Sequence, residues 1–133
     1  MNVLGTHLLL ELRECNPAFL DDIDYVKDAM VSAARVVEAQ IIGESFHRFK
    51  PQGVTGVLAI AESHLSIHTW PEHNKACIDL FTCKHIQIDD MVLRNIVDSY
   101  LLLVDLNFLF NIKFMIIEWP DFFTMGISTF IPF

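Results

Sequence analysis

Residues 61–83, AESHLSIHTWPEHNKACIDLFTC, contain two stretches in which apolar and polar side chains alternate. A strand turns successive side chains to opposite faces, so this alternation predicts a sheet with one buried face. Residues 64–71 form the first predicted strand, with an apolar face opposite a polar one: Leu65, Ile67 and Thr69 against His64, Ser66, His68 and Trp70. Residues 76–83 form the second, and one of its faces carries Cys77, Asp79, Phe81 and Cys83. Reactive side chains therefore gather on one side of the predicted sheet.

Two helices are expected in the rest of the chain. Apolar residues at steps of three and four predict a helix over residues 21–40, with Asp21 or Asp22 as its N-cap. Its buried face is expected to carry Ile23, Val26, Met30, Ala33 and Val37. A second helix is expected over residues 90–105, capped by Asp89 or Asp90. Four apolar residues fit its buried face only loosely: Met91, Ile96, Tyr100 and Val104.

The order of the elements predicts the fold class. Further strands are expected over residues 4–13, 41–50, 54–61 and 112–118, whereas the tail after residue 118 allows no assignment. Asn16-Pro17 ends the first of these strands, and Pro51-Gln52-Gly53 forms a turn before the third. Strand, helix, several strands, helix and strand in this order indicate an α+β fold. We expect a two-layer sandwich in which helices cover one face of an antiparallel sheet.

Length and charge limit the classes of function. The chain has 133 residues, 53% of them hydrophobic, which suits one domain over residues 1–133. Its formal net charge is −8, and it has no run of basic residues, so a nucleic-acid surface is not expected. The apolar stretch 101–117 is interrupted by polar residues, whereas a membrane helix needs about 20 nearly unbroken apolar residues. We expect neither a membrane span nor a signal peptide nor a lipid anchor.

Three cysteines, Cys15, Cys77 and Cys83, are too few and unevenly paired for a disulfide scaffold. We therefore expect free thiols in a reducing, cytoplasmic compartment.

Residue types alone leave the chemistry open. His64, His68, Cys77 and Cys83 are residue types that ligate zinc, but they lack the usual close spacing of a zinc site. Cys83 and His68 could instead form a nucleophilic pair, although a strand cysteine is more often a buried thiol and His68 a hydrogen-bonded sheet histidine. Spacing alone does not decide between these interpretations.

Three segments carry a family resemblance: LGTHLLLE (4–11), FHRFKPQGVTGVLAIAESHLSIHTWPE (46–72) and IDLFTC (78–83). In these segments the chain is similar to the prokaryotic-type S-adenosylmethionine decarboxylases, which are pyruvoyl-dependent enzymes of spermidine biosynthesis. The resemblance covers about three-fifths of the chain. After Cys83 the chain departs from many relatives, since Lys84 stands where they have glycine.

The resemblance implies a self-cleaving proenzyme. Cleavage between Glu62 and Ser63 would give a β chain, residues 1–62, and an α chain, residues 63–133. Ser63 would become the pyruvoyl group, a covalent cofactor that forms a Schiff base with the substrate and accepts electrons as CO₂ departs. His68 would be the acid–base group of processing, and Cys83 would be the proton donor in decarboxylation. Thr55, a serine in many relatives, would support processing through its hydroxyl group.

The resemblance also implies a substrate site. Phe49 and Trp70 match the rings that sandwich adenine, one from each subunit of a homodimer of cleaved α/β protomers. Glu72 matches the carboxylate that holds the ribose hydroxyls, and S-adenosylmethionine is the expected substrate. Two alternatives remain: a decarboxylase of arginine or ornithine on the same scaffold, and a catalytically silent paralogue that regulates an active subunit.

Overall fold

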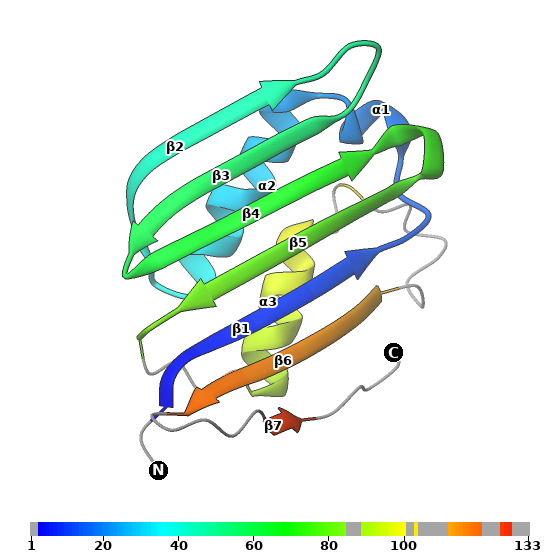
Figure 1. Cartoon of the computed structure of the whole chain (residues 1–133). Helices are drawn as coiled ribbons and strands as arrows, with labels where there is room; N and C mark the ends of the chain where they lie inside the picture. The colour runs from blue at the N-terminus through cyan, green and yellow to red at the C-terminus, as the bar shows by residue number, and fades with distance from the viewer. Residues whose placement is uncertain (1–2, 85–88, 101–102, 104–111, 121–125, 129–133) are drawn as a thin grey trace.

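The computed structural model describes residues 3–84, 89–100, 103, 112–120 and 126–128. This part of the chain forms one antiparallel sheet of seven strands in the order β2-β3-β4-β5-β1-β6-β7 (Figure 1). The strands are β1 (Val3–Leu12), β2 (Gln40–Arg48), β3 (Val54–Ala61), β4 (Ser63–Trp70), β5 (Lys75–Thr82), β6 (Ile112–Pro120) and β7 (Gly126–Ser128). All the strands predicted from the sequence are present, and β7 lies in the tail that allowed no assignment.

Helices cover one face of this sheet. They are α1 (Pro17–Leu20), α2 (Ile23–Val36) and α3 (Asp90–Tyr100), with a single 3₁₀ turn, η1 (Pro71–His73), between β4 and β5. Figure 1 shows α2 and α3 on the same side of the sheet. The prediction of a two-layer α+β sandwich is therefore confirmed. Among the described residues, no helix is long and apolar enough to cross a membrane.

The alternation in β4 has the predicted effect. Leu65, Ile67 and Thr69 are buried, whereas the side chains between them lie on the opposite, more accessible face. The buried side chains of β3, β4 and β5 belong to the same core as Val26 and Met30 of α2. The core therefore lies between the sheet and the helices, and the outer face of the sheet remains available for a site.

The first predicted helix is wrong in its bounds. Asn16 caps the separate short helix α1, and its side chain accepts a hydrogen bond from the N–H of Ala18. Asp22 rather than Asp21 caps α2, accepting from the N–H groups of Asp24 and Tyr25. The Asp21 carboxylate instead accepts hydrogen bonds from Arg48 and from the Gly53 N–H. Helix α2 ends at Val36, before the predicted residue 40.

The second predicted helix is correct in its start. The Asp89 carboxylate accepts a hydrogen bond of 2.8 Å from the N–H of Val92, as expected of an N-cap. Ile96 and Tyr100 are buried as predicted. The prediction that Met91 is buried is wrong, since its side chain is 66% exposed. The predicted residue Val104 and most of the segment 101–105 lie outside the described residues.

Candidate functional site

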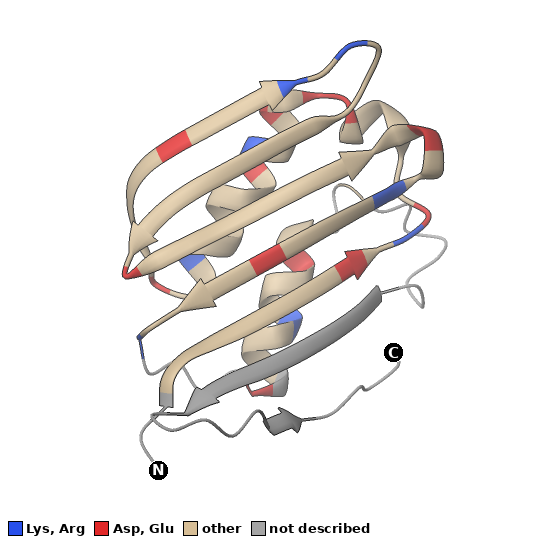
Figure 2. Cartoon of the chain, in the orientation of Figure 1, with Lys and Arg blue, Asp and Glu red and all other residues tan. Residues whose placement is uncertain are grey.

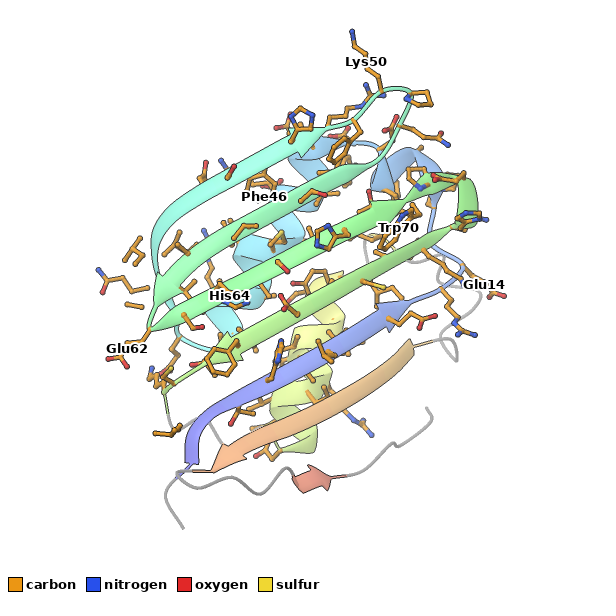
Figure 3. All side chains as sticks on the ribbon, in the orientation of Figure 1. Glu14, Phe46, Lys50, Glu62, His64 and Trp70 are labelled. Carbon is orange, nitrogen blue, oxygen red and sulfur yellow. The ribbon has the colours of Figure 1, made fainter. Side chains whose placement is uncertain are left out.

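The candidate site lies on the outer face of β3, β4 and β5. Figure 2 shows that β3 and β4 carry no Lys, Arg, Asp or Glu, and the neighbouring charged residues on this face are Lys75 and Asp79 of β5. Figure 3 shows Glu62 at the turn between β3 and β4, and Trp70 near the opposite end of β4. The predicted site residues divide between these two ends of the strand.

The first group surrounds the predicted cleavage point. Glu62 alone separates β3 from β4, and Ser63 pairs with Ile60 across the turn. The carbonyl oxygen of Glu62 accepts a hydrogen bond from the backbone N–H of Cys83, with 3.2 Å between oxygen and nitrogen. Ser63 has a φ of 153°, a backbone conformation that residues other than glycine rarely adopt and that costs energy. The peptide bond in question is thus held in a tight turn with its oxygen bonded to a fixed donor.

A polar network adjoins Ser63. The Ser63 hydroxyl oxygen lies 3.4 Å from Nδ1 of His64, whose Nε2 lies 3.5 Å from Oδ2 of Asp79. Nε2 of His7, on β1, lies 3.0 Å from the same carboxylate oxygen. The Ser66 hydroxyl donates a hydrogen bond to the other oxygen, Oδ1.

The Asp79 carboxylate remains ionised in this network. Partial burial acts to raise the pKa of Asp79. The hydrogen bonds from Ser66 and His7 and the electrostatic interactions with the His64 and His7 rings outweigh that burial and hold the pKa below its ordinary value. This network was not predicted from the sequence. The alternation did predict the faces that hold His64 and Asp79, but His7 required the pairing of β1 with β5.

The second group surrounds His68. The Thr55 hydroxyl oxygen lies 3.0 Å from Nδ1 of His68, and the His68 and Trp70 rings are 6.2 Å apart between centroids. Glu72, in η1, accepts a hydrogen bond of 3.3 Å from the Gln52 amide. Phe49 is exposed just after β2, with its ring 4.7 Å from that of His47. Five residues therefore lie at one end of the sheet, namely Phe49, Thr55, His68, Trp70 and Glu72.

The two groups do not meet within one chain. His68 stands five residues along β4 from Ser63, which is about 16 Å at roughly 3.3 Å per residue. The register agrees, because His68 pairs with Cys77, whereas Ser63 pairs with Thr82, next to Cys83. A Cys83–His68 nucleophilic pair within one chain is therefore wrong. Among the described residues, no group of three or more His, Cys, Asp or Glu side chains that could hold a metal ion lies together.

The three cysteines are free, as predicted, but differ in burial, since Cys15 is buried and the other two are exposed. Burial raises the pKa of the Cys15 thiol to about 12, so this thiol stays protonated. Partial burial and the nearby Glu11 carboxylate raise the pKa of Cys77, although Lys75 opposes them. Cys83 is exposed beside the turn that holds Ser63. A proton donor at position 83 would therefore be accessible to a substrate at Ser63.

Comparisons with known proteins show the family of this chain. Residues 6–101 match the model of the S-adenosylmethionine decarboxylase family. The S-adenosylmethionine decarboxylase proenzyme of Thermodesulfovibrio yellowstonii is 47% identical over 100 residues, which are 75% of this chain and 74% of that protein. The proenzyme of Caldanaerobacter subterraneus is 51% identical over 83 residues, 62% of this chain and 67% of that protein.

A solved structure extends the likeness to nearly the whole chain. The crystal structure of the adenosylmethionine decarboxylase from Aquifex aeolicus aligns with a TM-score of 0.74 and 26% sequence identity. The alignment covers 96% of this chain and 100% of that one. The family predicted from the sequence is therefore confirmed. The chain belongs to the S-adenosylmethionine decarboxylase family of carboxy-lyases.

Proposed function

We propose that this chain cuts itself between Glu62 and Ser63 and then, as a pyruvoyl enzyme, decarboxylates S-adenosylmethionine to the aminopropyl donor of spermidine synthesis. The observation that carries the proposal is the hydrogen bond from the Cys83 N–H to the Glu62 carbonyl oxygen. When the Ser63 hydroxyl attacks that carbonyl, negative charge develops on its oxygen. A donor already in place stabilises this charge, as oxyanion-hole donors do.

Cleavage generates the reactive group from the chain itself. The hydroxyl attack moves the Glu62 acyl group from the Ser63 nitrogen to its oxygen, giving an ester. Elimination of the Glu62 carboxylate leaves dehydroalanine at position 63, and water then releases ammonia to form the pyruvoyl group. Once formed, this group supplies an electron sink for decarboxylation. The exposed Cys83 thiol then returns a proton to the substrate carbon.

A second copy of the chain completes the site. Within one chain, Ser63 and Cys83 lie at one end of β4, and His68 and Trp70 lie towards the other. The outer face of β3 and β4 has no charged side chain, and Val57 and Trp70 are 36% and 40% exposed on it. Two such faces packed in opposite directions would bring the His68 end of each copy to the Ser63 end of the other. This arrangement supports the predicted homodimer.

The His68 end has the groups that a nucleoside requires. Phe49 and Trp70 are exposed aromatic rings that suit stacking on adenine. Glu72, oriented by Gln52, offers a carboxylate to the ribose hydroxyls. The aromatic faces would also attract the sulfonium cation. In this proposal the Thr55 hydroxyl orients the His68 ring during processing, and the reaction takes place in the reducing cytoplasm.

The test is the intact mass of the purified protein under denaturing conditions, beside a Ser63→Ala control. The expected result is two fragments that meet after Glu62, with the larger one lighter than a serine-started peptide by the mass of ammonia. The Ser63→Ala chain should stay whole. The purified enzyme should release labelled CO₂ from carboxyl-labelled S-adenosylmethionine and not from arginine or ornithine.

Each contrary result contradicts a different part of the proposal. A wild-type chain that stays whole would overturn self-processing and favour the silent paralogue. A processed chain that releases CO₂ from arginine or ornithine but not from S-adenosylmethionine would overturn the substrate.

A further inference from the structure

The polar network beside Ser63 is contained within one chain. It runs from Ser63 through His64 to Asp79, and His7 and Ser66 hold the far side of the carboxylate. The distances are 3.4 Å from the Ser63 hydroxyl oxygen to His64 Nδ1 and 3.5 Å from His64 Nε2 to Asp79. His68, by contrast, is about 16 Å from Ser63 along β4 at the usual rise per residue.

We propose that His64 is the catalytic base that takes the Ser63 hydroxyl proton in the first step of self-cleavage, with Asp79 as its positioning residue. This inference rests on the proposed function, since it concerns the same peptide bond. A hydroxyl, an imidazole and a carboxylate in this order activate serine in unrelated hydrolases, where geometry rather than sequence position identifies them. His64 and Ser63 belong to the same chain, so this step needs no second copy.

The Asp79 carboxylate favours one tautomer of His64. An ionised carboxylate can only accept, so the tautomer with its proton on Nε2, 3.5 Å from Asp79 Oδ2, is the favoured one. Nδ1 then carries the lone pair, on the side that faces the Ser63 hydroxyl. Asp79 is itself oriented at both oxygens, because Ser66 binds Oδ1 and His7 binds Oδ2. Two strands besides β5 thus hold the carboxylate that positions the base.

The step balances without any further reactant. As the Ser63 oxygen bonds to the Glu62 carbonyl carbon, its proton passes to His64 Nδ1. The carbonyl electron pair moves to the Glu62 oxygen, where the Cys83 N–H holds it. When the carbonyl reforms, the carbon–nitrogen bond breaks and His64 returns the proton to the Ser63 nitrogen. The products are an ester and a free amine, with no net change in protons.

The test follows cleavage of the full-length chain with time after a pulse of cell-free synthesis. The variants are His64→Ala, His64→Gln and Asp79→Asn, and the exposed His73→Ala is the matched control. General base catalysis contributes about 10²- to 10⁴-fold, so both His64 variants should cut at least about 100-fold more slowly. Added imidazole should partly restore cleavage in His64→Ala but not in Asp79→Asn. Hydroxylamine, which splits esters, should release no extra fragment from His64→Ala, because the block precedes the ester.

The possible outcomes separate this inference from the proposed function. If the wild-type chain stays whole, both are overturned. If the wild type cuts and the two His64 variants cut equally fast, only the role of His64 is overturned. If His64→Ala accumulates an ester that hydroxylamine splits, His64 acts after the acyl shift and the assignment to the first step is wrong. Thermal unfolding of each variant shows whether it folds, and a folded His64→Ala chain whose cleavage imidazole does not restore contradicts a base at position 64.

Discussion

The backbone nitrogen of Cys83 lies 3.2 Å from the carbonyl oxygen of Glu62, so the end of β5 is tied to the turn between β3 and β4. Cys83 therefore has two separable roles in the proposed function, one for its backbone and one for its side chain. Its backbone N–H would act on the chain during self-cleavage, and its thiol would act on the substrate afterwards.

Substitutions at position 83 should separate the role of the backbone N–H in cleavage from the role of the thiol in decarboxylation. Cys83→Ala keeps the N–H, so it should still cut but lose most decarboxylation. Cys83→Pro removes the N–H and should slow cutting by about 10²- to 10³-fold, the usual cost of one oxyanion donor. Fragment formation on a denaturing gel and release of labelled CO₂ measure the two steps. Equal cutting in a folded Cys83→Pro chain would show that the backbone donor plays no part.

Mixing two inactive chains should restore one active site. If the site is shared between copies, two variants can together form one complete site. The Ser63→Ala chain would supply His68, and the His68→Ala chain would supply Ser63. We expect the His68→Ala chain to be cut when both are co-expressed, and to stall as an ester when expressed alone, because its own His64 still serves the first step. Differently tagged chains identify the cut one by mass. Failure of the mixture, despite co-purification of the two tags, would show that His68 of one copy does not serve Ser63 of the other.

Gly56 should tolerate no larger side chain while Phe46 lies over it. A Cβ at Gly56 would lie 2.3 Å from Phe46 Cε1, closer than packed atoms allow, and 3.1 Å from the Met30 sulfur, which is a tight contact. Gly56→Ala should therefore lower the free energy of unfolding by about 1–3 kcal/mol, the usual cost of overpacking. Urea unfolding measures this loss. The double variant Gly56→Ala/Phe46→Leu should lose less than the sum of the two single changes, because the smaller side chain leaves room, and simple additivity would contradict this contact.

Acid should weaken the fold partly through Asp79. Its pKa is lowered in the folded chain, so its stabilising contribution is fully present above the unfolded value of about 3.9 and disappears as the pH falls through the lower folded value. Asp79→Asn cannot make this contribution. Its urea midpoint should therefore lie below that of the wild type near neutral pH, with the gap narrowing at about pH 3. A gap that stays constant with pH would show that the carboxylate charge does not stabilise the fold.

The sequence predicted those features of the fold that depend on a local pattern of residues, such as the two faces of a strand. Alternation in residues 64–71 fixed the face of each side chain, because a strand has a period of two. It could not give the register between strands, which placed Cys83 beside Ser63 rather than beside His68. The His7–Asp79 contact likewise depends on pairing between β1 and β5, whose residues are far apart in the chain. The choice between Asp21 and Asp22 as cap also required the structure, since Arg48 and Gly53 bind Asp21 from another part of the chain.

Strand order has a mechanical consequence for the proposed cut. β1 belongs to residues 1–62, yet it lies between β5 and β6, which both belong to residues 63–133 (Figure 1). β3 of the first fragment is also bonded to β4 of the second. Strands of the two fragments are thus hydrogen-bonded neighbours within one sheet. Pulling them apart would require three backbone ladders to be broken together, so the severed chain should persist as a single folded body.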